Sequence, residues 1–474
     1  MVPVKLCAAF ALALSAFGAG GFDARFEEIK KRATREQLYA FLYALPKGGD
    51  LHNHFGLTTH AELWFEYATD PSKNGNNAYY TRLRHADCEG DNAPFVRYRT
   101  VQRATFERLP ACQKGEYAPL AGLTAQQKAD WLASLKLDRP GEGRNEFFEV
   151  IVARMGDMPR EPVLFCNVIA ETIRRMGAEG VRYLESQAAT VNWRDRDGNP
   201  VSPDAGAAYL RQMLQRPEVK ASGVEVRFLH PVLRFHPQAE QGVENTYAFV
   251  DRHRDLWVGI NLLGREDNDK GYPLRFLETF RKMRRKYSGI RLSIHGGEKD
   301  SPGTDVRETL LLGAERIGHG VNLITDPDTL LLLRGGRYLV EIQLISNRLL
   351  EYTPDLNEHP FPEYLRTGIP VCLNTDDPGP WDSNLTDEYF TAVTHFNLAW
   401  DEIVTLGRNS LSYSFAPEDL KKRLLAEYES AVRAFENRFD TNGWAETLKG
   451  AQPAVTGYAR RTFGLTAAGE KQNR

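Results

Sequence analysis

Ile290-Arg-Leu-Ser-Ile-His295-Gly-Gly-Glu298 is a short apolar run that ends in a histidine, two glycines and a glutamate. An apolar run bounded by turn residues is typical of a buried strand. A histidine at the end of such a strand can bind a metal ion. A glutamate that follows a Gly-Gly turn can then reach whatever the metal activates. The stretch therefore predicts a metal-dependent catalytic site at the end of a buried strand.

Three further stretches place histidine or aspartate at the end of an apolar run. They are Leu51-His52-Asn53-His54 upstream, and Gly318-His319-Gly320 and Asn374-Thr375-Asp376-Asp377-Pro378 downstream. Side chains two positions apart on a strand point to the same face, so His52 and His54 can act together. The four stretches together predict a single site that is built from strands distant in sequence.

Helical and strand patterns alternate through most of the chain. The predicted strands cover residues 50–54, 181–186, 224–230, 256–263, 290–295, 316–319, 338–343 and 370–375. Eight strands that alternate with helices predict an α/β fold, a (β/α)₈ TIM barrel. Active sites in such barrels lie at the C-terminal ends of the strands, where all four stretches are expected.

The barrel is expected within residues 22–450, with extra N- and C-terminal helices and a polar tail at 451–474. A long insertion at about 66–145 follows the first strand, because α/β connections usually have only about 2–6 residues. Cys88 and Cys112 share this polar, turn-rich insertion and are a candidate disulfide. The other two cysteines beyond the N-terminal segment, Cys166 and Cys372, lie in apolar runs and are expected to be buried thiols.

Residues 1–20 have the features of a secretory signal peptide. Lys5 precedes the uncharged stretch Leu6–Phe17, and small residues follow. A buried N-terminal helix is the alternative. Cleavage would leave a periplasmic or secreted protein, in a compartment where disulfides form. No later apolar run approaches the roughly 20 residues that span a bilayer, so no membrane association is expected after cleavage.

The overall charge gives no sign of a nucleic-acid partner. The 474 residues carry a formal net charge of −3, which argues against a broad basic surface. A small-molecule substrate is expected instead, and a homodimer is compatible with the sequence.

His52, His54, His295 and Asp376 together offer three nitrogens and one carboxylate oxygen. This donor set suits Zn²⁺, with one ion per chain and a water molecule in the remaining position. A histidine pair on a strand is more often structural than metal-binding when it stands alone. The matching order of the other motifs favours the metal site.

With these motifs in this order, the chain resembles the adenosine deaminase family. The resemblance rests on Leu51–His54, His295–Glu298, Glu315–Gly320, Ser346-Asn347 and Leu373–Pro378, and it spans about residues 46–440 outside the insertion. The lead-in Pro46–His54, the insertion and the signal peptide look most like the secreted branch, which includes the adenosine-deaminase-related growth factors. The resemblance implies zinc-dependent hydrolysis of adenosine, and of 2′-deoxyadenosine, to an inosine-type product and ammonia.

The resemblance also implies roles for individual residues. Glu298 would protonate the purine ring, His319 would orient the attacking water, and Asp377 would contact the purine and help to deprotonate the water. Gly264 matches a glycine whose backbone N–H contacts the purine. Phe148 aligns loosely with a helix that covers the substrate, although core packing explains it equally well. Asp377 has an alternative use as the cap of the following helix.

One position departs from the family pattern and leaves the substrate open. An acidic residue that contacts the ribose usually stands two positions after the second histidine, and here that position is Gly56. Adenine, an adenine nucleotide or another 6-aminopurine is therefore an alternative substrate. A two-metal hydrolase is a further alternative, but Asn261–Arg265 at the end of strand four contains no bridging lysine. A binding factor that acts through the insertion is the alternative of another class.

Overall fold

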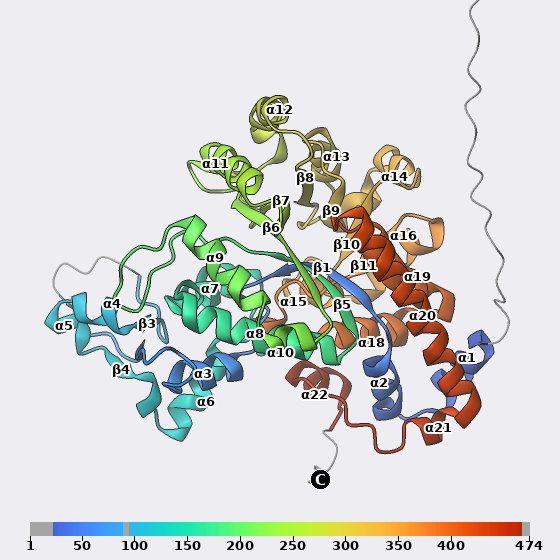
Figure 1. Cartoon of the computed structure of the whole chain (residues 1–474), viewed down its shortest axis with the longest axis horizontal. Coiled ribbons are helices and arrows are strands. Elements are labelled where there is room, and N and C mark those ends of the chain that lie inside the picture. Colours follow the sequence, from blue (N-terminus) through green and yellow to red (C-terminus); the bar gives the residue numbers. More distant parts are fainter. Residues whose placement is uncertain (1–21, 89–93, 467–474) are drawn as a thin grey trace, which may run out of the picture.

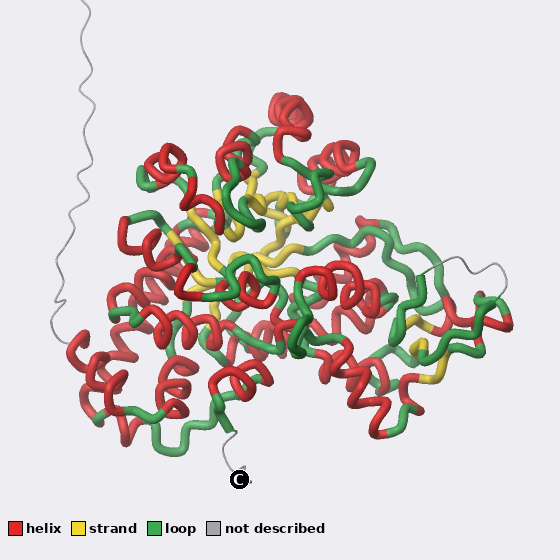
Figure 2. Tube along the Cα trace, turned by 180° about the vertical axis from the view of Figure 1, so that it is seen from behind, coloured by secondary structure: helices red, strands yellow, loops and turns green. Residues whose placement is uncertain are grey.

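The computed structural model describes residues 22–88 and 94–466, and the predicted signal peptide lies outside them. Eight parallel strands form one sheet in the order β1-β5-β6-β7-β8-β9-β10-β11, which confirms the predicted barrel strands. Their bounds are β1 (Gly48–His54), β5 (Val181–Gln187), β6 (Glu225–Leu233), β7 (Trp257–Leu263), β8 (Arg291–Gly296), β9 (Arg316–His319), β10 (Leu339–Ile342) and β11 (Val371–Leu373). Figures 1 and 2 show this sheet at the centre of the molecule.

The barrel closes between β11 and β1 at the residues predicted to form the site. Asn53 and Asp376 form an isolated parallel bridge rather than a regular ladder. The backbone N–H of His54 donates to the carbonyl of Asp376 at 3.0 Å, and the N–H of Asp376 donates to the carbonyl of His52 at 2.9 Å. The two ends of the sheet are therefore joined directly beneath the candidate ligands.

Helices surround the sheet, so its strands are buried on both faces. All four residues of β10 are buried, as expected of parallel strands covered on both sides. The larger surrounding helices are α8 (Pro162–Ala178), α9 (Pro203–Leu214), α11 (Ala239–Arg252), α12 (Leu277–Lys286), α13 (Asp305–Leu311), α14 (Pro327–Leu333), α16 (Phe361–Thr367), α18 (Leu385–Phe396) and α19 (Trp400–Ser412). None of the helices in the described residues has both the length and the apolar character that crossing a membrane requires.

Additional helices from both ends of the chain pack together outside the barrel. They are α1 (Phe22–Arg32), α2 (Arg35–Ala44), α20 (Glu418–Asn442), α21 (Trp444–Thr447) and α22 (Gly457–Phe463). Thr34 and Gln37 form a capping box at the start of α2, and the Phe41 and Phe439 rings lie 4.8 Å apart. The capping box starts α2, and the contact between the two rings packs α2 against α20 (Figure 1).

The prediction of a polar tail at 451–474 is wrong for the part that forms α22. Tyr458 and Ala459 are buried there, and the Phe463 ring lies 4.5 Å from Phe390. Arg461 also pairs with Asp382 at 2.8 Å. The segment has a polar sequence pattern, but the few apolar side chains of Tyr458, Ala459 and Phe463 are enough to pack a seven-residue helix on the existing surface.

The insertion forms a small separate lobe on one side of the barrel, as the views in Figures 1 and 2 agree. It contains α3 (Ala61–Thr69), β2 (Tyr79–Arg82), β3 (Thr100–Gln102), α4 (Arg103–Arg108), α5 (Ala111–Lys114), β4 (Tyr117–Pro119) and α6 (Ala125–Ser134). The three strands pair in the order β3-β2-β4 as an antiparallel sheet.

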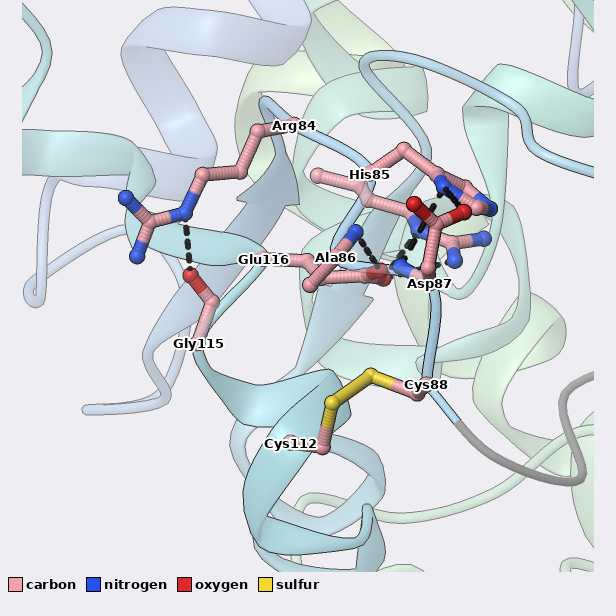
Figure 3. Close-up of a disulfide and its surroundings, with 9 residues drawn as sticks. Arg84, His85, Ala86, Asp87, Cys88, Cys112, Gly115 and Glu116 are labelled. Carbon is pink, nitrogen blue, oxygen red and sulfur yellow. Dashed lines mark hydrogen bonds and ion pairs between the residues drawn. A yellow bond between two sulfur atoms is a disulfide. The ribbon is translucent and has the colours of Figure 1, made fainter.

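A disulfide joins Cys88 to Cys112 within this lobe, as the sequence predicts (Figure 3). Close to it, the buried Glu116 accepts hydrogen bonds from the backbone N–H of Ala86 at 2.8 Å and from Arg82 at 2.6 Å. The two remaining described cysteines, Cys166 and Cys372, are buried thiols, which was also expected.

Candidate active site

The ends of four barrel strands bring three of the four predicted ligands together with His319. His52 on β1, His295 on β8, His319 on β9 and Asp376 after β11 offer ligand atoms that all lie within 4.8 Å of one another. His54 belongs to an adjoining group with Asp376 and Asp377. Residues separated by more than 300 positions in sequence thus meet at the C-terminal mouth of the barrel.

Two of these residues have strained backbones. His319 has φ 65° and Asp376 has φ 59°, the left-handed region that side chains with a Cβ rarely adopt. Such a conformation costs on the order of 1–3 kcal/mol and persists only where the surrounding structure imposes it. His319 is the last residue of β9 and Asp376 lies three positions after the end of β11, so the strained conformations occur where the chain leaves the barrel strands.

The hydrogen bonds of His52 and His295 fix which of their nitrogens are free. Nδ1 of His52 lies 2.7 Å from the Glu341 carboxylate, and Nδ1 of His295 lies 2.9 Å from the side-chain amide oxygen Oδ1 of Asn261. Because both partners are acceptors, each Nδ1 carries the proton and each Nε2 has a lone pair. These two Nε2 atoms face each other at 3.1 Å. Two lone pairs at this distance repel unless a cation lies beside them.

His54 and Asp376 supply two further free donor atoms. Nδ1 of His54 donates to the Asp377 carboxylate at 2.7 Å, so its Nε2 also has a lone pair. This buried Nε2 has no hydrogen-bond partner, and neither has Oδ1 of Asp376, which lies 3.3 Å from Nδ1 of His54. The other oxygen of Asp376 accepts a hydrogen bond from Ser346 at 2.6 Å. Unpartnered buried atoms of this kind are rare and point to a missing ligand.

His319 differs from the other histidines because a hydrogen-bond relay fixes the opposite tautomer. The backbone N–H of Phe361 donates to Nδ1 of His359 at 3.1 Å, so Nε2 of His359 carries the proton. That Nε2 donates to Oδ1 of Asn347 at 3.2 Å, and Nδ2 of Asn347 donates to Nδ1 of His319 at 3.1 Å. Nε2 of His319 is therefore the protonated nitrogen and cannot bind a metal ion.

The free lone pairs thus indicate which atoms of these five residues are available to bind a metal ion. They belong to Nε2 of His52, His54 and His295 and to the Asp376 carboxylate, which is the set that the sequence predicts. Three imidazole nitrogens with one carboxylate suit a divalent zinc ion, with an open position for water. Carboxylate and amide partners on the second nitrogen of each histidine are the usual support for such ligands.

Glu298 is buried beside this set, on the loop that follows β8. One carboxylate oxygen lies 3.6 Å from Nε2 of His319. Burial raises the pKa of Glu298 well above its ordinary value, and the nearby carboxylates of Asp376 and Glu266 raise it further. A carboxyl group that keeps its proton at neutral pH can serve as a general acid.

Glu266 holds the Glu298 loop in place, a role that the sequence interpretation missed. Its carboxylate accepts the backbone N–H groups of Gly297 at 3.0 Å and Glu298 at 3.4 Å. It also pairs with the buried Arg234 at 3.3 Å. Arg234 in turn donates to the carbonyl of His295 at 2.6 Å. This network ties the general-acid candidate to a candidate ligand.

Asp377 does not cap the following helix with its side chain. It is the first flanking residue of α17 (Pro378–Trp381), but its carboxylate makes no capping hydrogen bond and contacts His54 instead. Burial raises the pKa of Asp377 to about 6. The capping alternative is therefore contradicted, and the side chain is directed to the site.

A cavity of about 870 Å³ opens above these residues, large enough for a nucleoside. Its lining includes the predicted substrate-binding residues Gly264, Asp377 and Phe148. Gly264 has φ 101°, and an added Cβ would come within 2.7 Å of Phe235, so only glycine fits there. Phe147 packs 4.8 Å from Trp381, whereas Phe148 is only half-buried, which favours Phe148 as the residue that meets a ligand.

Several supporting residues were not predicted from the sequence. Glu341 and Asn261 lie inside strands, and nothing in their local pattern marks them. His359 has no motif around it in the sequence, and in the structure it is buried and orients Asn347. The pair Ser346-Asn347 was noted only through the family resemblance. The carboxylate of Glu388 holds this pair in place, because it accepts the first N–H groups of α15 (Leu344–Leu349) at 3.0 Å.

Comparison with known proteins agrees with this geometry. An adenosine deaminase of Enterococcus faecalis is 30% identical over 262 residues, which cover 55% of this chain and 74% of the relative. An adenine deaminase of Chelativorans sp. is 28% identical over 271 residues, or 56% of this chain and 80% of the relative. The solved structure of an ADAL–IMP complex shares the fold, with a TM-score of 0.62 at 21% identity, over 84% of this chain and 99% of that one.

The profile described as adenosine deaminase matches residues 145–431, more than half of the sequence. The match includes β5 to β11. It therefore contains every candidate site residue except His52 and His54, which lie on β1. The chain belongs to the adenosine deaminase family.

Proposed function

We propose that the protein hydrolytically deaminates a 6-aminopurine nucleoside, with adenosine and 2′-deoxyadenosine as substrates. The observation that carries this proposal is the buried Glu298, whose pKa is raised by burial, beside a cluster of imidazoles and the Asp376 carboxylate. In the reaction, the oxygen of water forms a bond to C6 of the purine. The bond from C6 to the amino nitrogen then breaks, and ammonia leaves with the transferred protons.

We infer that His52, His54, His295 and Asp376 hold one zinc ion per chain. The support for this inference is that ligand atoms of His52, His295 and Asp376 lie within 4.8 Å of one another and that Nε2 of the adjoining His54 has no hydrogen-bond partner. His319 is distinguished from them by the hydrogen bond that Asn347 donates to its Nδ1. When bound, zinc makes water a nucleophile near neutral pH by lowering its pKa from about 15.7 to about 7.

The residues of this chain would then position the purine and move its protons. Glu298 donates its proton to the ring nitrogen beside C6, which makes C6 more electrophilic. The Nε2–H of His319 donates a hydrogen bond to the attacking oxygen, and Asp377 contacts the imidazole side of the purine. Gly264, which follows the C-terminal end of β7 and lines the cavity, offers its backbone N–H to the purine. These roles are those of general acid–base catalysis by positioned groups.

The alternative substrates differ from adenosine at the sugar end of the purine compound, away from C6. Relatives of the chain include an adenine deaminase, and a protein of the same fold was solved with IMP. Adenine, an adenine nucleotide or another 6-aminopurine therefore stays the second candidate. The free donor atoms of the cluster favour a single metal ion over a two-metal centre.

A substrate panel tests the proposed function. The purified, zinc-loaded chain is incubated with adenosine, 2′-deoxyadenosine, adenine and AMP, and both ultraviolet absorbance and ammonia release are followed. We expect the two nucleosides to be converted fastest, with one ammonia released per purine. Fast conversion of adenine or AMP without conversion of adenosine would overturn the choice of substrate. No ammonia from any of the four would overturn the reaction itself.

We also propose that the protein is exported. The signal-peptide pattern of residues 1–20 motivates this proposal, and the Cys88–Cys112 disulfide supports it because such bonds persist in oxidising compartments. Recovery of the native protein outside the cytoplasm, shortened at its N-terminus by mass spectrometry, is the expected result. A full-length chain confined to the cytoplasm would contradict export.

A further inference from the structure

Gln187 is a buried amide that the proposed chemistry does not use. It is the last residue of β5, its exposed fraction is 4%, and it lines the active-site cavity. Neither its Nε2 nor its Oε1 has a hydrogen-bond partner in the protein. Leaving a buried polar group unpaired is unfavourable, so an amide with neither atom hydrogen-bonded needs an explanation.

The position of Gln187 places its amide beside the reacting centre. In the parallel register, its Cα pairs with that of His54, and the backbone N–H of Phe55 donates to its carbonyl at 3.1 Å. Residues paired in this way point to the same side of a sheet, and the side chain of His54 faces the barrel mouth. The free amide of Gln187 is therefore directed into the same part of the cavity.

Gly56 leaves open space in the cavity that Gln187 also lines. It follows His54 by two positions and lines the same cavity. A Cβ added at Gly56 would meet only one atom within 4 Å, the Cβ of Pro159 at 3.4 Å. The space that an acidic side chain would take is thus left open, and Gln187, at the end of the neighbouring strand, brings an unpartnered polar side chain to the same cavity.

The charges around the cavity favour a neutral ligand group at this point. Among the described lining residues, Arg252 is the one lysine or arginine, and it is paired with Asp204 at 3.1 Å. The carboxyl groups of Glu298, Asp376 and Asp377 line the cavity as well. A phosphate dianion would be desolvated there without a matching cation, which is costly. An amide, by contrast, both donates to and accepts from sugar hydroxyls.

We propose that Gln187 binds the ribose of a neutral nucleoside and so selects nucleosides over the free base and over 5′-nucleotides. Its Nε2–H donates to a ribose oxygen, and its Oε1 accepts from a ribose hydroxyl. This inference rests on the proposed function, because it names the residue that reads the sugar in the same site. Gln187 acts on binding and takes no part in the proton transfers.

Gln187→Leu tests the inference, because leucine keeps the approximate size and removes both polar atoms. The variant is compared with the wild type on adenosine and on adenine. Calorimetric binding of inosine and of hypoxanthine gives a second readout that needs no catalysis. We expect kcat/KM for adenosine and affinity for inosine to fall about tenfold or more, mainly through KM, while the values for adenine and hypoxanthine stay unchanged.

Gln343→Leu is the matched control. Gln343 is also buried with both amide atoms unpartnered, but it is not among the residues that line the cavity. This variant should leave the ratio of adenosine to adenine turnover, and of inosine to hypoxanthine affinity, at the wild-type value. A ratio that falls equally in both variants would mean a structural effect and would overturn the role of Gln187.

The possible failures are distinguishable. If the wild type deaminates adenosine and Gln187→Leu does so with the same kcat/KM, the inference fails and the proposed function stands. An equal fall in kcat/KM for adenosine and for adenine would also overturn the inference. Preferred turnover of AMP by the wild type would contradict the neutral-ligand argument. If the wild type releases no ammonia from any purine, the proposed function fails, and the inosine-to-hypoxanthine affinity ratio alone decides the role of Gln187.

Discussion

Nδ2 of Asn347 lies 3.1 Å from Nδ1 of His319, and this contact decides which nitrogen of the histidine carries its proton. The orientation of the Asn347 amide is set in turn by His359, whose own tautomer is set by the backbone N–H of Phe361. A backbone N–H is always a donor, so the relay has only one consistent arrangement. It directs an N–H group of His319 toward the side of Glu298.

Asn347→Asp should invert this arrangement with almost no change in shape. The carboxylate would accept from both His359 and His319, so the proton of His319 would move to Nδ1. We expect kcat on adenosine to fall by about 10²-fold or more, because a positioned proton donor is lost. Asn245→Asp adds the same charge elsewhere along the cavity and is the control. A wild-type kcat for Asn347→Asp at normal zinc content would refute the relay.

Removal of single histidines should separate ligands from non-ligands. We expect His54→Ala to lose most of its bound zinc after dialysis, because one of four donor atoms is gone. His319→Ala should keep about one zinc per chain and lose turnover. The measurement is metal content by atomic emission, with protein quantified in parallel. The reverse pattern, with zinc lost from His319→Ala alone, would show that the tautomer argument chose the wrong donor.

The sequence was sufficient to predict the barrel because each strand has its own local signal. The run before His295 is apolar and ends at a Gly-Gly turn, and β10 is apolar apart from the buried Glu341. Helix α22 escaped prediction because its anchors, Tyr458 and Phe463, are isolated apolar residues in a polar segment. Their contacts lie on distant helices such as α18, and a local pattern contains no trace of those contacts.

The candidate ligands could also be predicted, because each stands at the end of an apolar run or shortly after it. The residues that orient them could not. Glu341 and Asn261 are ordinary strand positions in sequence, and their function depends on which strands become neighbours in the barrel. The same is true of His359, which lies beyond the end of α15, whereas its partner Asn347 lies within that helix. Tautomers and unpartnered amides such as that of Gln187 are properties of three-dimensional packing alone.

Mild acid should destabilise the protein partly through His230. Burial lowers the pKa of His230 to about 4 in the folded state, below the value of about 6.5 expected for the unfolded chain. The unfolded chain therefore takes up a proton first as the pH falls. The contribution of His230 is complete above about pH 6.5 and should shrink by about 2 kcal/mol between pH 8 and pH 5.

Urea unfolding at pH 8 and pH 5 measures this effect, with His230→Gln as the reference. The variant should lose less unfolding free energy between the two pH values than the wild type, by about 2 kcal/mol. An identical pH dependence for both proteins would show that His230 is protonated in the folded state as well.

Loss of the disulfide should loosen the insertion without stopping catalysis. Cys88 and Cys112 are 24 positions apart, and closing a loop of this length stabilises by about 3 kcal/mol in the chain-entropy model. The double variant Cys88→Ser, Cys112→Ser should be cut faster by protease within residues 70–140, while kcat on adenosine stays near the wild-type value. If the double variant resists protease as well as the wild type, the disulfide does not stabilise the insertion. If the variant keeps its zinc but loses turnover, catalysis in the barrel depends on the insertion.

Glu298→Gln is the most direct test of a metal-assisted deaminase with a carboxylic acid as proton donor. Glutamine preserves the shape of the side chain but cannot deliver the proton that the buried Glu298 retains. Ammonia release from adenosine is measured for both proteins at equal, verified zinc content. We predict a rate about 10²–10⁴-fold below that of the wild type, with zinc still bound. Turnover at the wild-type rate would contradict the assignment of Glu298 as the general acid.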